Sequence, residues 1–391
     1  MKKNIYILIS LIVSVCMIII IFPKVKPYYS RYIQKKELYK FHSVVDVSDN
    51  TFNSLSLLND DISNNEIFFA GEKHGSIKSI DMNFYLLKYF VEKAGIKYIL
   101  YEGGYSYAQY LNTYLDTGDE SILEYLFYNS SNTMSYTFEN YNLLREIYEY
   151  NLTLSKNKKI KFIGIDIENP SIAIKYINSK IPTLEPTSNI LKDFIDILKS
   201  ITLKNYLIES KKAIEFIEKY RTEVEEYLGE EFFDISFIVK NLSVSNGQVA
   251  REEKLINNFI TLYEYLPKGK YFGQFGEAHT NLNNKSKSLA SYLQNVYDST
   301  KGKVINIAYF YNNSKGYVPD NLNEGTEIFQ YLDPKLFSKD NSTILIKLNY
   351  KDSIFYEKDI YLNDNNPAVN YHQYLILFTN SPSANKFYRT I

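Results

Sequence analysis

The sequence predicts an α/β protein with a mostly parallel central sheet flanked by helices. Short apolar runs of strand length alternate with amphipathic helical patterns along most of the chain after residue 66. Residues 66–102 read as strand, loop, helix and strand, which is a βαβ unit. The chain has 391 residues, of which 45% are hydrophobic, so it can bury a large core. These three observations together favour one sizeable α/β domain.

The βαβ unit begins with an apolar strand at residues 67–70, which leads directly into Gly-Glu-Lys-His-Gly. A helical pattern follows, and a second strand at residues 98–101 ends just before Glu102. A βαβ connection predicts that the two strands are parallel neighbours. Because such sheets bind ligands at the carboxyl ends of their strands, Glu72, His74 and Glu102 are expected to converge there.

The next strand ends in acidic residues. Helices are predicted at residues 105–115, 121–127 and 138–154, before a buried strand at residues 161–168. Asp166 and Glu168 stand two residues apart, so an extended backbone points both side chains to the same side. The alternative is an acid that caps the next helix beside a solvated turn.

Residues 183–245 contain long helical patterns rich in lysine and glutamate and show no strand signal. They are interpreted as a helical insertion over the sheet. On the helix that follows, Arg251, Leu255 and Asn258 share one face. An arginine and an asparagine within an apolar stripe need partners, which a carboxylate cluster or an anionic reaction intermediate would supply. The alternative is a surface arginine at the start of a helix.

A second strand-to-histidine segment closes the pattern. The strand that begins at Lys270 runs into Gly276-Glu277-Ala278-His279, which repeats the Gly-Glu-x-His signature of Gly71 to His74. Two of the four histidines therefore share one context in separate parts of the chain. This repetition predicts a shared site. Further strands are expected at residues 304–310, 343–348 and 374–378, with a helix near residues 286–296.

Composition and missing motifs exclude several classes. The net charge is −1, so no nucleic-acid partner is indicated. The sequence contains no P-loop, GxGxxG, HExxH, CxxC or GxSxG motif. Its single cysteine, Cys16, lies in the N-terminal apolar run, so the folded part offers no thiol nucleophile. The sequence leaves the oligomeric state open.

The apolar run at residues 5–22 is just long enough to span a bilayer. The expected organisation is an anchor at residues 1–23, a stalk at residues 24–50, and a single α/β domain at residues 51–391. The alternative to an anchor is a cleaved signal peptide. Lysines and an arginine after the run favour a cytoplasmic C-terminus. The short basic start followed by the apolar run is nevertheless typical of an export signal, so the domain is expected outside the cytoplasm at the cell membrane.

These motifs resemble the erythromycin-esterase-like pattern, part of a wider group that includes ChaN-like and TraB/Tiki-like proteins. The matching features, spread over about residues 64–310, are GEKHG after the first strand, an acid at Glu102, Gly-Ile-Asp ending at Asp166, an Arg-x-x-x-Leu-x-x-Asn helix from Arg251, and a late strand ending in a histidine. The chain departs from the esterases by a shorter first motif and by Gly276 in place of a histidine. It also lacks an arginine near Met82. The shorter first motif and the Gly-x-x-His late motif are closer to those of the ChaN and Tiki branches.

The resemblance implies an α/β fold with helical additions and a site lined by His, Glu and Arg. It implies His74 as general base, Glu72 and Glu102 as acidic site residues, and Arg251 and His279 as further site residues. Asp166, Glu168, Glu277 and Asn258 are expected to support them.

Three functions follow from this constellation. The first is a hydrolase in which His74 activates water near pH 7, Glu72 orients the ring, and Arg251 stabilises the oxyanion, on a small-molecule or peptide substrate. The second adds a divalent metal, Zn, Mn or Fe, held by His74 and His279 with carboxylates such as Glu72 or Glu277. The third is a non-enzymatic protein that binds a ligand such as haem, as the ChaN-like resemblance implies.

Overall fold

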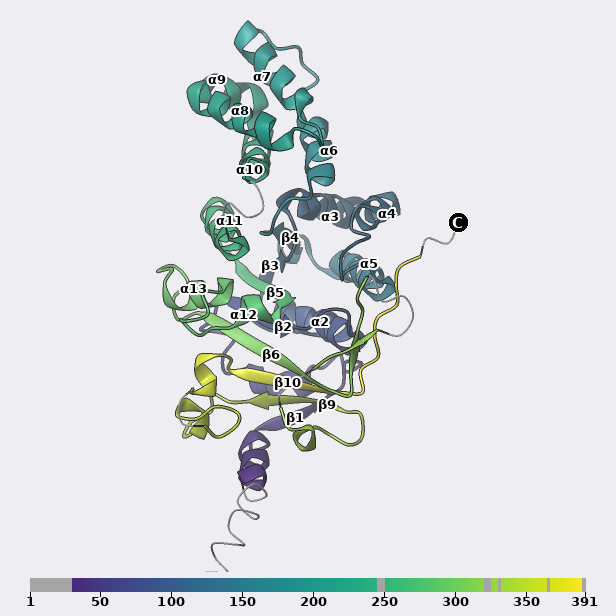
Figure 1. Cartoon of the computed structure of the whole chain (residues 1–391), viewed down its shortest axis with the longest axis vertical. Coiled ribbons are helices and arrows are strands. Elements are labelled where there is room, and N and C mark those ends of the chain that lie inside the picture. Colours follow the sequence, from purple (N-terminus) through teal and green to yellow (C-terminus); the bar gives the residue numbers. More distant parts are fainter. Residues whose placement is uncertain (1–29, 245–249, 320–324, 330–331, 364–365, 389–391) are drawn as a thin grey trace, which may run out of the picture.

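The computed structural model describes residues 30–244, 250–319, 325–329, 332–363 and 366–388. An 8-stranded sheet forms its centre, in the order β1-β9-β10-β6-β2-β5-β3-β4. Seven of these strands run in one direction. The exception is β9, which pairs antiparallel with both β1 and β10. The predicted fold class is therefore confirmed (Figure 1). The strands are β1 (His42–Val45), β2 (Ile67–Glu72), β3 (Ile96–Tyr101), β4 (Lys161–Gly164), β5 (Lys270–Gly276), β6 (Val304–Asn312), β9 (Thr343–Lys347) and β10 (Tyr374–Thr379).

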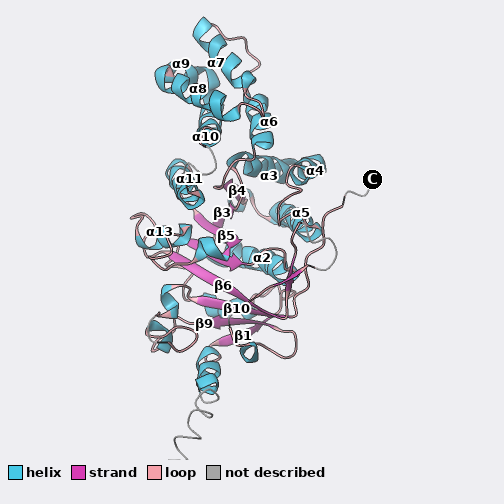
Figure 2. Cartoon of the chain, in the orientation of Figure 1, coloured by secondary structure: helices cyan, strands magenta, loops and turns pink. Residues whose placement is uncertain are grey.

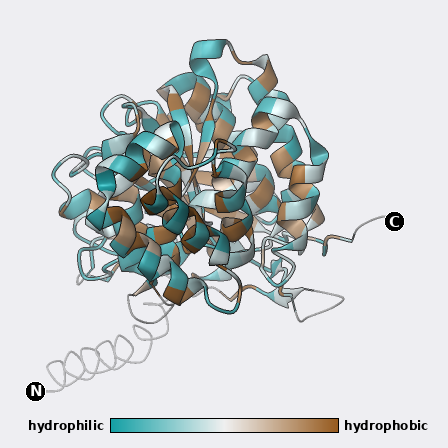
Figure 3. Cartoon of the chain, turned by 90° about the horizontal axis from the view of Figure 1, so that it is seen from above, coloured by the Kyte–Doolittle hydropathy of each residue, from teal (hydrophilic) through white to brown (hydrophobic). Residues whose placement is uncertain are grey.

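Both faces of the sheet are covered by helices, as a parallel sheet requires. On β2, Phe68 and Ala70 pack into one apolar cluster, whereas Ile67 and Phe69 pack into another on the opposite face. Side chains alternate along a strand, so an unbroken apolar run fits a strand that is buried on both faces. Seen from above, the helices carry hydrophobic and hydrophilic residues on different sides (Figure 3).

Helices α2 (Ile77–Tyr89), α4 (Glu120–Tyr128) and α5 (Phe138–Thr153) pack on the first face, and α3 (Tyr105–Thr117) contributes to both clusters. The second face is covered by α11 (Arg251–Tyr265) and α13 (Leu289–Asn295). A short helix, α12 (Glu277–Thr280), directly follows β5. The site described below lies where β2, β3 and β5 end.

Helices α6 (Pro170–Lys180), α7 (Asn189–Ser200), α8 (Tyr206–Lys219), α9 (Arg221–Leu228) and α10 (Phe232–Leu242) form a helical lobe. This lobe extends from the sheet along the long axis of the molecule, and no strand lies within its described part (Figure 2). The strand-free region therefore begins at α6, earlier than residue 183. Asn169 caps α6 by accepting a hydrogen bond from the N–H of Ser171, and Pro170 occupies its first turn.

The predicted neighbour relation of the first two strands is wrong. β2 and β3 are parallel, but β5 lies between them and pairs with both. The strand that leads into the second Gly-Glu-x-His copy, β5, therefore lies in the sheet between the two strands of the βαβ unit that contains the first copy. This strand order places Gly276 directly opposite Glu72 in the register of β2 and β5.

The stalk boundary also needs correction. Residues 42–45, inside the predicted stalk, form β1 at the edge of the sheet, and Leu38 is fully buried in an apolar cluster with Leu336. The folded part therefore begins before residue 51. The predicted anchor at residues 5–22 lies outside the described residues. Within the described ranges, no helix is long and apolar enough to cross a membrane.

Candidate functional site

The first Gly-Glu-x-His segment places an acid against its own histidine. Glu72 is the last residue of β2, and its Oε1 lies 3.1 Å from Nδ1 of His74. The hydroxyl of Ser79, a buried residue of α2, donates to the other carboxylate oxygen, Oε2, at 3.1 Å. The carboxylate is therefore held from both sides. The Nε2 atom of His74 remains available to a ligand.

The two segments meet at Gly276. A Cβ atom at this position would stand 3.1 Å from Nε2 of His74 and 3.6 Å from Cδ2 of His279. The backbone N–H of Gly276 donates to Oε2 of Glu102 at 2.8 Å. Glycine thus leaves space between the two imidazole rings. The structure brings together Glu72, His74, Glu102 and His279, which the sequence placed on three separate strands.

Arg251 links two of the carboxylates. Its Nε donates to Asp166 Oδ1 at 3.0 Å, and its Nη2 donates to Glu102 Oε1 at 2.8 Å and also to Asp166. The side chains of Asp166 and Glu102 are only 7% and 14% exposed, whereas that of Arg251 is 45% exposed. The hydrogen bonds that Arg251 donates to Asp166 raise the pKa of the guanidinium above its ordinary value, although burial opposes them. The arginine therefore neutralises two largely buried acids and keeps an open side.

His279 has an acidic partner that the sequence argument missed. Its Nδ1 is hydrogen-bonded to a carboxylate oxygen of Glu252, and its Nε2 lies 3.5 Å from Oε1 of Glu102. The second oxygen of Glu252 accepts the N–H of Leu289 at 2.7 Å. Glu252 stands in the first turn of α11, where acids are common because they complement the helix dipole. Nothing in the neighbouring sequence distinguishes Glu252 from an ordinary acidic residue at the start of a helix.

Both histidines hold their protons more tightly than a free imidazole. Burial is the largest single influence on His74 and lowers its pKa. The hydrogen bond and charge of Glu72, with the charge of Glu102, outweigh burial and raise the pKa of His74 to about 9. Burial likewise lowers the pKa of His279, but Glu252 and Glu102 raise it overall. Glu72 and Glu102 therefore favour the protonated form of His74 up to a higher pH than in an ordinary histidine.

Two predicted supporting residues, Glu277 and Asn258, make contacts around the site. Glu277 lies 3.1 Å from the ammonium of Lys73, with its own side chain half exposed. Asn258 is buried and donates to the carbonyl of Ile165 at 3.0 Å, which fixes the loop before Asp166. Asn258 therefore positions the backbone before Asp166, whereas Glu277 forms a partly exposed ion pair with the residue that precedes His74.

Glu168 lies apart from Asp166, so the prediction that both point to one side is wrong. β4 ends at Gly164, so neither acid lies within the strand. The Glu168 carboxylate is buried and accepts from the hydroxyl of Ser106 at 2.5 Å and from its N–H at 3.2 Å. Burial is the main cause that raises its pKa from 4.5 to about 7, against these hydrogen bonds. Glu168 therefore holds the first turn of α3.

Replacing Glu168 by glutamine is expected to change the pH dependence of stability. The folded state binds this proton more tightly than the unfolded state, so its stabilisation is complete below pH 4.5 and is lost as pH rises through about 7. The difference in unfolding free energy between the native protein and Glu168→Gln should shift by about 3 kcal/mol across this window. Urea titrations from pH 4.5 to 7.5 measure it. A difference that is constant with pH would show that Glu168 is not the titrating group.

Several carboxylates around the site are already paired with cationic side chains. The guanidinium of Arg251 lies between Asp166 and Glu102, where it neutralises carboxylates that a cation would use. Lys73 does the same for Glu277. In the part of the chain that the structure describes, no three His, Cys, Asp or Glu side chains gather so that they could hold a metal ion.

Comparisons with known proteins support the fold. A scan against protein-family models and a search of curated proteins find no match. Among solved structures, the chain is similar to a protein from Bacillus cereus, with a TM-score of 0.66 and 18% identity over 91% of this chain and 99% of that chain. It is also similar to a succinoglycan biosynthesis protein, with a TM-score of 0.64 and 17% identity over 90% of this chain and 98% of that chain.

A third similar structure is a histidine-to-asparagine mutant of the erythromycin esterase EreC in its open conformation. The TM-score is 0.57, with 13% identity over 90% of this chain and 100% of that chain. The similarity to these three structures extends over nearly their whole length. The chain therefore shares the fold of erythromycin esterase.

Proposed function

We propose that this chain is a hydrolase that activates water for the cleavage of an ester or amide bond in a small-molecule or peptide substrate. The observation that carries the proposal is the Glu72–His74 pair at 3.1 Å, next to the Arg251 cluster at the same strand ends. A base, a carboxylate that orients it and a fixed cation are the groups that acyl transfer to water needs. The shared fold of erythromycin esterase agrees with this chemistry.

Glu72 determines which nitrogen of His74 acts. Its carboxylate at Nδ1 selects the tautomer that keeps the proton there, so Nε2 of the neutral ring can accept a proton from water. The same carboxylate stabilises the imidazolium that results. His74 then returns the proton to the leaving group.

Arg251 is suited to stabilise the oxyanion that forms when water attacks the carbonyl. Its Nε and Nη2 groups bind Asp166 and Glu102, which hold the guanidinium in place. Its Nη1 group donates no hydrogen bond to any described residue, and the side chain is 45% exposed. A preorganised donor of this kind costs little reorganisation when charge develops.

The value of kcat/KM is expected to rise with pH and to reach its maximum in the alkaline range. His74 acts as a base only in its neutral form, so activity should increase as pH passes through about 9. Glu72→Gln removes the hydrogen bond and charge that raise the pKa of His74, so burial should move this rise to lower pH and maximal activity should fall. Steady-state rates from pH 6 to 10 provide the test. If kcat/KM of Glu72→Gln rises over the same pH range as that of the native protein, Glu72 does not control the pKa of His74.

A panel of chromogenic esters and fluorogenic peptides, with and without a chelator, tests the proposed function itself. The proposal predicts turnover of at least one ester or amide that survives the chelator. Turnover that disappears with the chelator and returns with Zn, Mn or Fe would support the metal-dependent alternative. No turnover, together with stoichiometric haem binding seen as a Soret band, would support the binding protein instead.

A further inference from the structure

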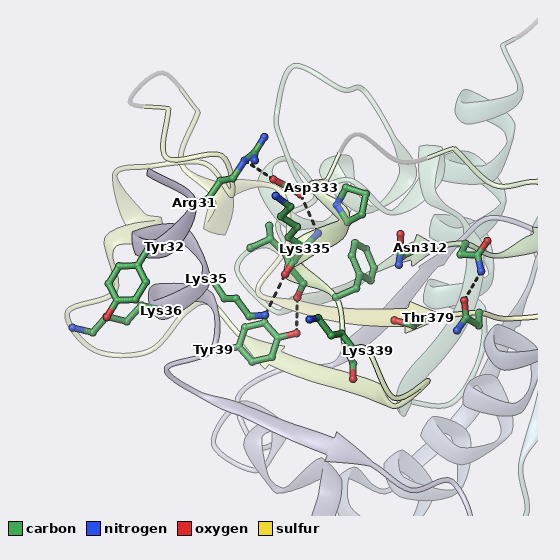
Figure 4. Close-up of a pocket in the computed structure, with 16 residues that line it drawn as sticks. Arg31, Tyr32, Lys35, Lys36, Tyr39, Asn312, Asp333, Lys335, Lys339 and Thr379 are labelled. Carbon is green, nitrogen blue, oxygen red and sulfur yellow. Dashed lines mark hydrogen bonds and ion pairs between the residues drawn. The ribbon is translucent and has the colours of Figure 1, made fainter. Parts of the chain in front are cut away.

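A cavity of about 1080 Å³ lies away from the site described above. One wall is the helix at residues 30–38, and a second is the loop at residues 333–339. The remaining wall is formed where β6 and β10 end, at Asn312 and Thr379 (Figure 4). The cavity therefore joins the first described helix of the chain to the sheet.

The walls of this cavity are strongly cationic. They carry five basic side chains and a single carboxylate, Asp333. The basic residues are Arg31, Lys35, Lys36, Lys335 and Lys339. Asp333 is already engaged, since it pairs with Nε of Arg31 at 2.7 Å and accepts the N–H of Lys335 at 3.0 Å.

Three of these lysines carry a charge that no carboxylate of the described residues neutralises. The Lys35 ammonium donates to the carbonyl of Lys335 at 3.2 Å. The ammonium groups of Lys35, Lys335 and Lys339 contact no carboxylate among the described residues, and all three side chains are exposed. The Lys36 ammonium points away from those of the other lysines (Figure 4). The mutual repulsion of Lys35, Lys335 and Lys339 is relieved if an anion binds between them.

The cavity also has an apolar wall. Tyr39 is held in place by a hydrogen bond from its hydroxyl to the carbonyl of Leu336 at 2.6 Å, and Leu336 and Phe337 are buried beside it. Tyr32 lies at the rim with 65% of its surface exposed. Cationic and aromatic walls together suit an anion that carries an apolar part.

The predicted anchor lies close to this cavity in the sequence. Only residues 23–30 separate the apolar run at residues 5–22 from Arg31. Eight extended residues reach at most about 28 Å. If the run spans the membrane, the cavity must therefore stay near the lipid headgroups, and Lys24 and Lys26 add positive charge on the way.

We propose that this cavity binds the phosphate headgroup of an anionic phospholipid. Lys35, Lys335 and Lys339 contact the phosphate, and the wall formed by Tyr39, Leu336 and Phe337 packs against the glycerol and the start of the acyl chains. The bound lipid orients the domain on the membrane to which its N-terminal segment attaches it. The proposal does not depend on the hydrolytic site.

Calorimetric titration of the full-length protein in detergent tests the proposal. The probes are dihexanoyl phosphatidylglycerol, dihexanoyl phosphatidylcholine and inorganic phosphate. The variant Lys35→Gln, Lys335→Gln, Lys339→Gln removes these three charges. The matched control is Lys199→Gln, Lys204→Gln, Lys211→Gln, which removes three exposed lysines of the helical lobe. Equal thermal midpoints verify that both variants fold.

We expect saturable binding of phosphatidylglycerol, weakened roughly 100-fold in the cavity variant and less than twofold in the control. Phosphatidylcholine and inorganic phosphate should bind at least tenfold more weakly. Equal affinity for the two lipids, or no loss in the cavity variant, would overturn the proposal. Inorganic phosphate that binds as tightly as phosphatidylglycerol would assign the cavity to a soluble phosphate compound and refute the lipid.

Discussion

Replacing His74 by glutamine is expected to lower kcat/KM for the hydrolysed substrate roughly 100- to 10,000-fold, the usual contribution of a general base. Glutamine keeps a polar group within reach of Glu72 and Ser79, so the fold should survive the change. Because Nε2 of His74 lies in the space beside Gly276, the loss should fall on kcat more than on KM. Steady-state kinetics with the best substrate of the ester and peptide panel measure the effect.

His42→Gln is the matched control. His42 is exposed, and its ring contacts only the carbonyl of Tyr39 and the Tyr39 ring among the described residues. Its replacement should leave kcat/KM within about twofold of the native value. Equal activity of the native protein and His74→Gln, with both folded, would remove His74 from the mechanism.

Replacing Arg251 by methionine is expected to reduce both activity and stability. Methionine retains much of the apolar stem but leaves Asp166 and Glu102 as largely buried acids without their counter-charge. We expect a loss of about 1–3 kcal/mol in unfolding free energy, since Arg251 is itself partly exposed. Loss of the cation should also lower kcat roughly 100- to 1000-fold, the range seen when one oxyanion donor is removed.

Arg221→Met separates these effects from the mere loss of an arginine. Arg221 forms an exposed pair with Glu225 at 3.5 Å, one helical turn away on α9. Such pairs contribute about 0.3–0.5 kcal/mol. Urea titrations and kinetics of both variants decide the question. An Arg251→Met protein as stable and active as Arg221→Met would contradict the assigned role.

Local patterns were sufficient to predict the fold class. The uninterrupted apolar run at residues 67–70 predicted a strand, and β2 is a strand that is buried on both faces. The order of strands in the sheet was not accessible in this way. Nothing in the composition of β5 shows that it inserts between β2 and β3, because strand order depends on long-range packing. The edge strand β1 was missed because His42–Val45 is too short to show a clear period.

The candidate site, too, could be predicted from the sequence only in part. The repeated Gly-Glu-x-His signature indicated His74 and His279, and the polar residues within the α11 stripe indicated that Arg251 needs acidic partners. Which acids those are depends on where β3 and β4 end. Asp166 reaches Arg251, whereas Glu168 turns to Ser106, because the chain leaves the strand at Gly164 and Asn169 begins a helix. Glu252 acquires its role only through the approach of His279.

Direct titration of the histidine rings tests the central claim without knowledge of the substrate. The chain has four histidines, so their ring carbons can be resolved by NMR in the full-length protein and assigned with His74→Gln. The account predicts that His74 keeps its proton until about pH 9, and that Glu72→Gln moves this midpoint to lower pH. A midpoint near 6.5 for His74 in both proteins, the value of an ordinary histidine, would show that the Glu72–His74 pair does not exist in solution.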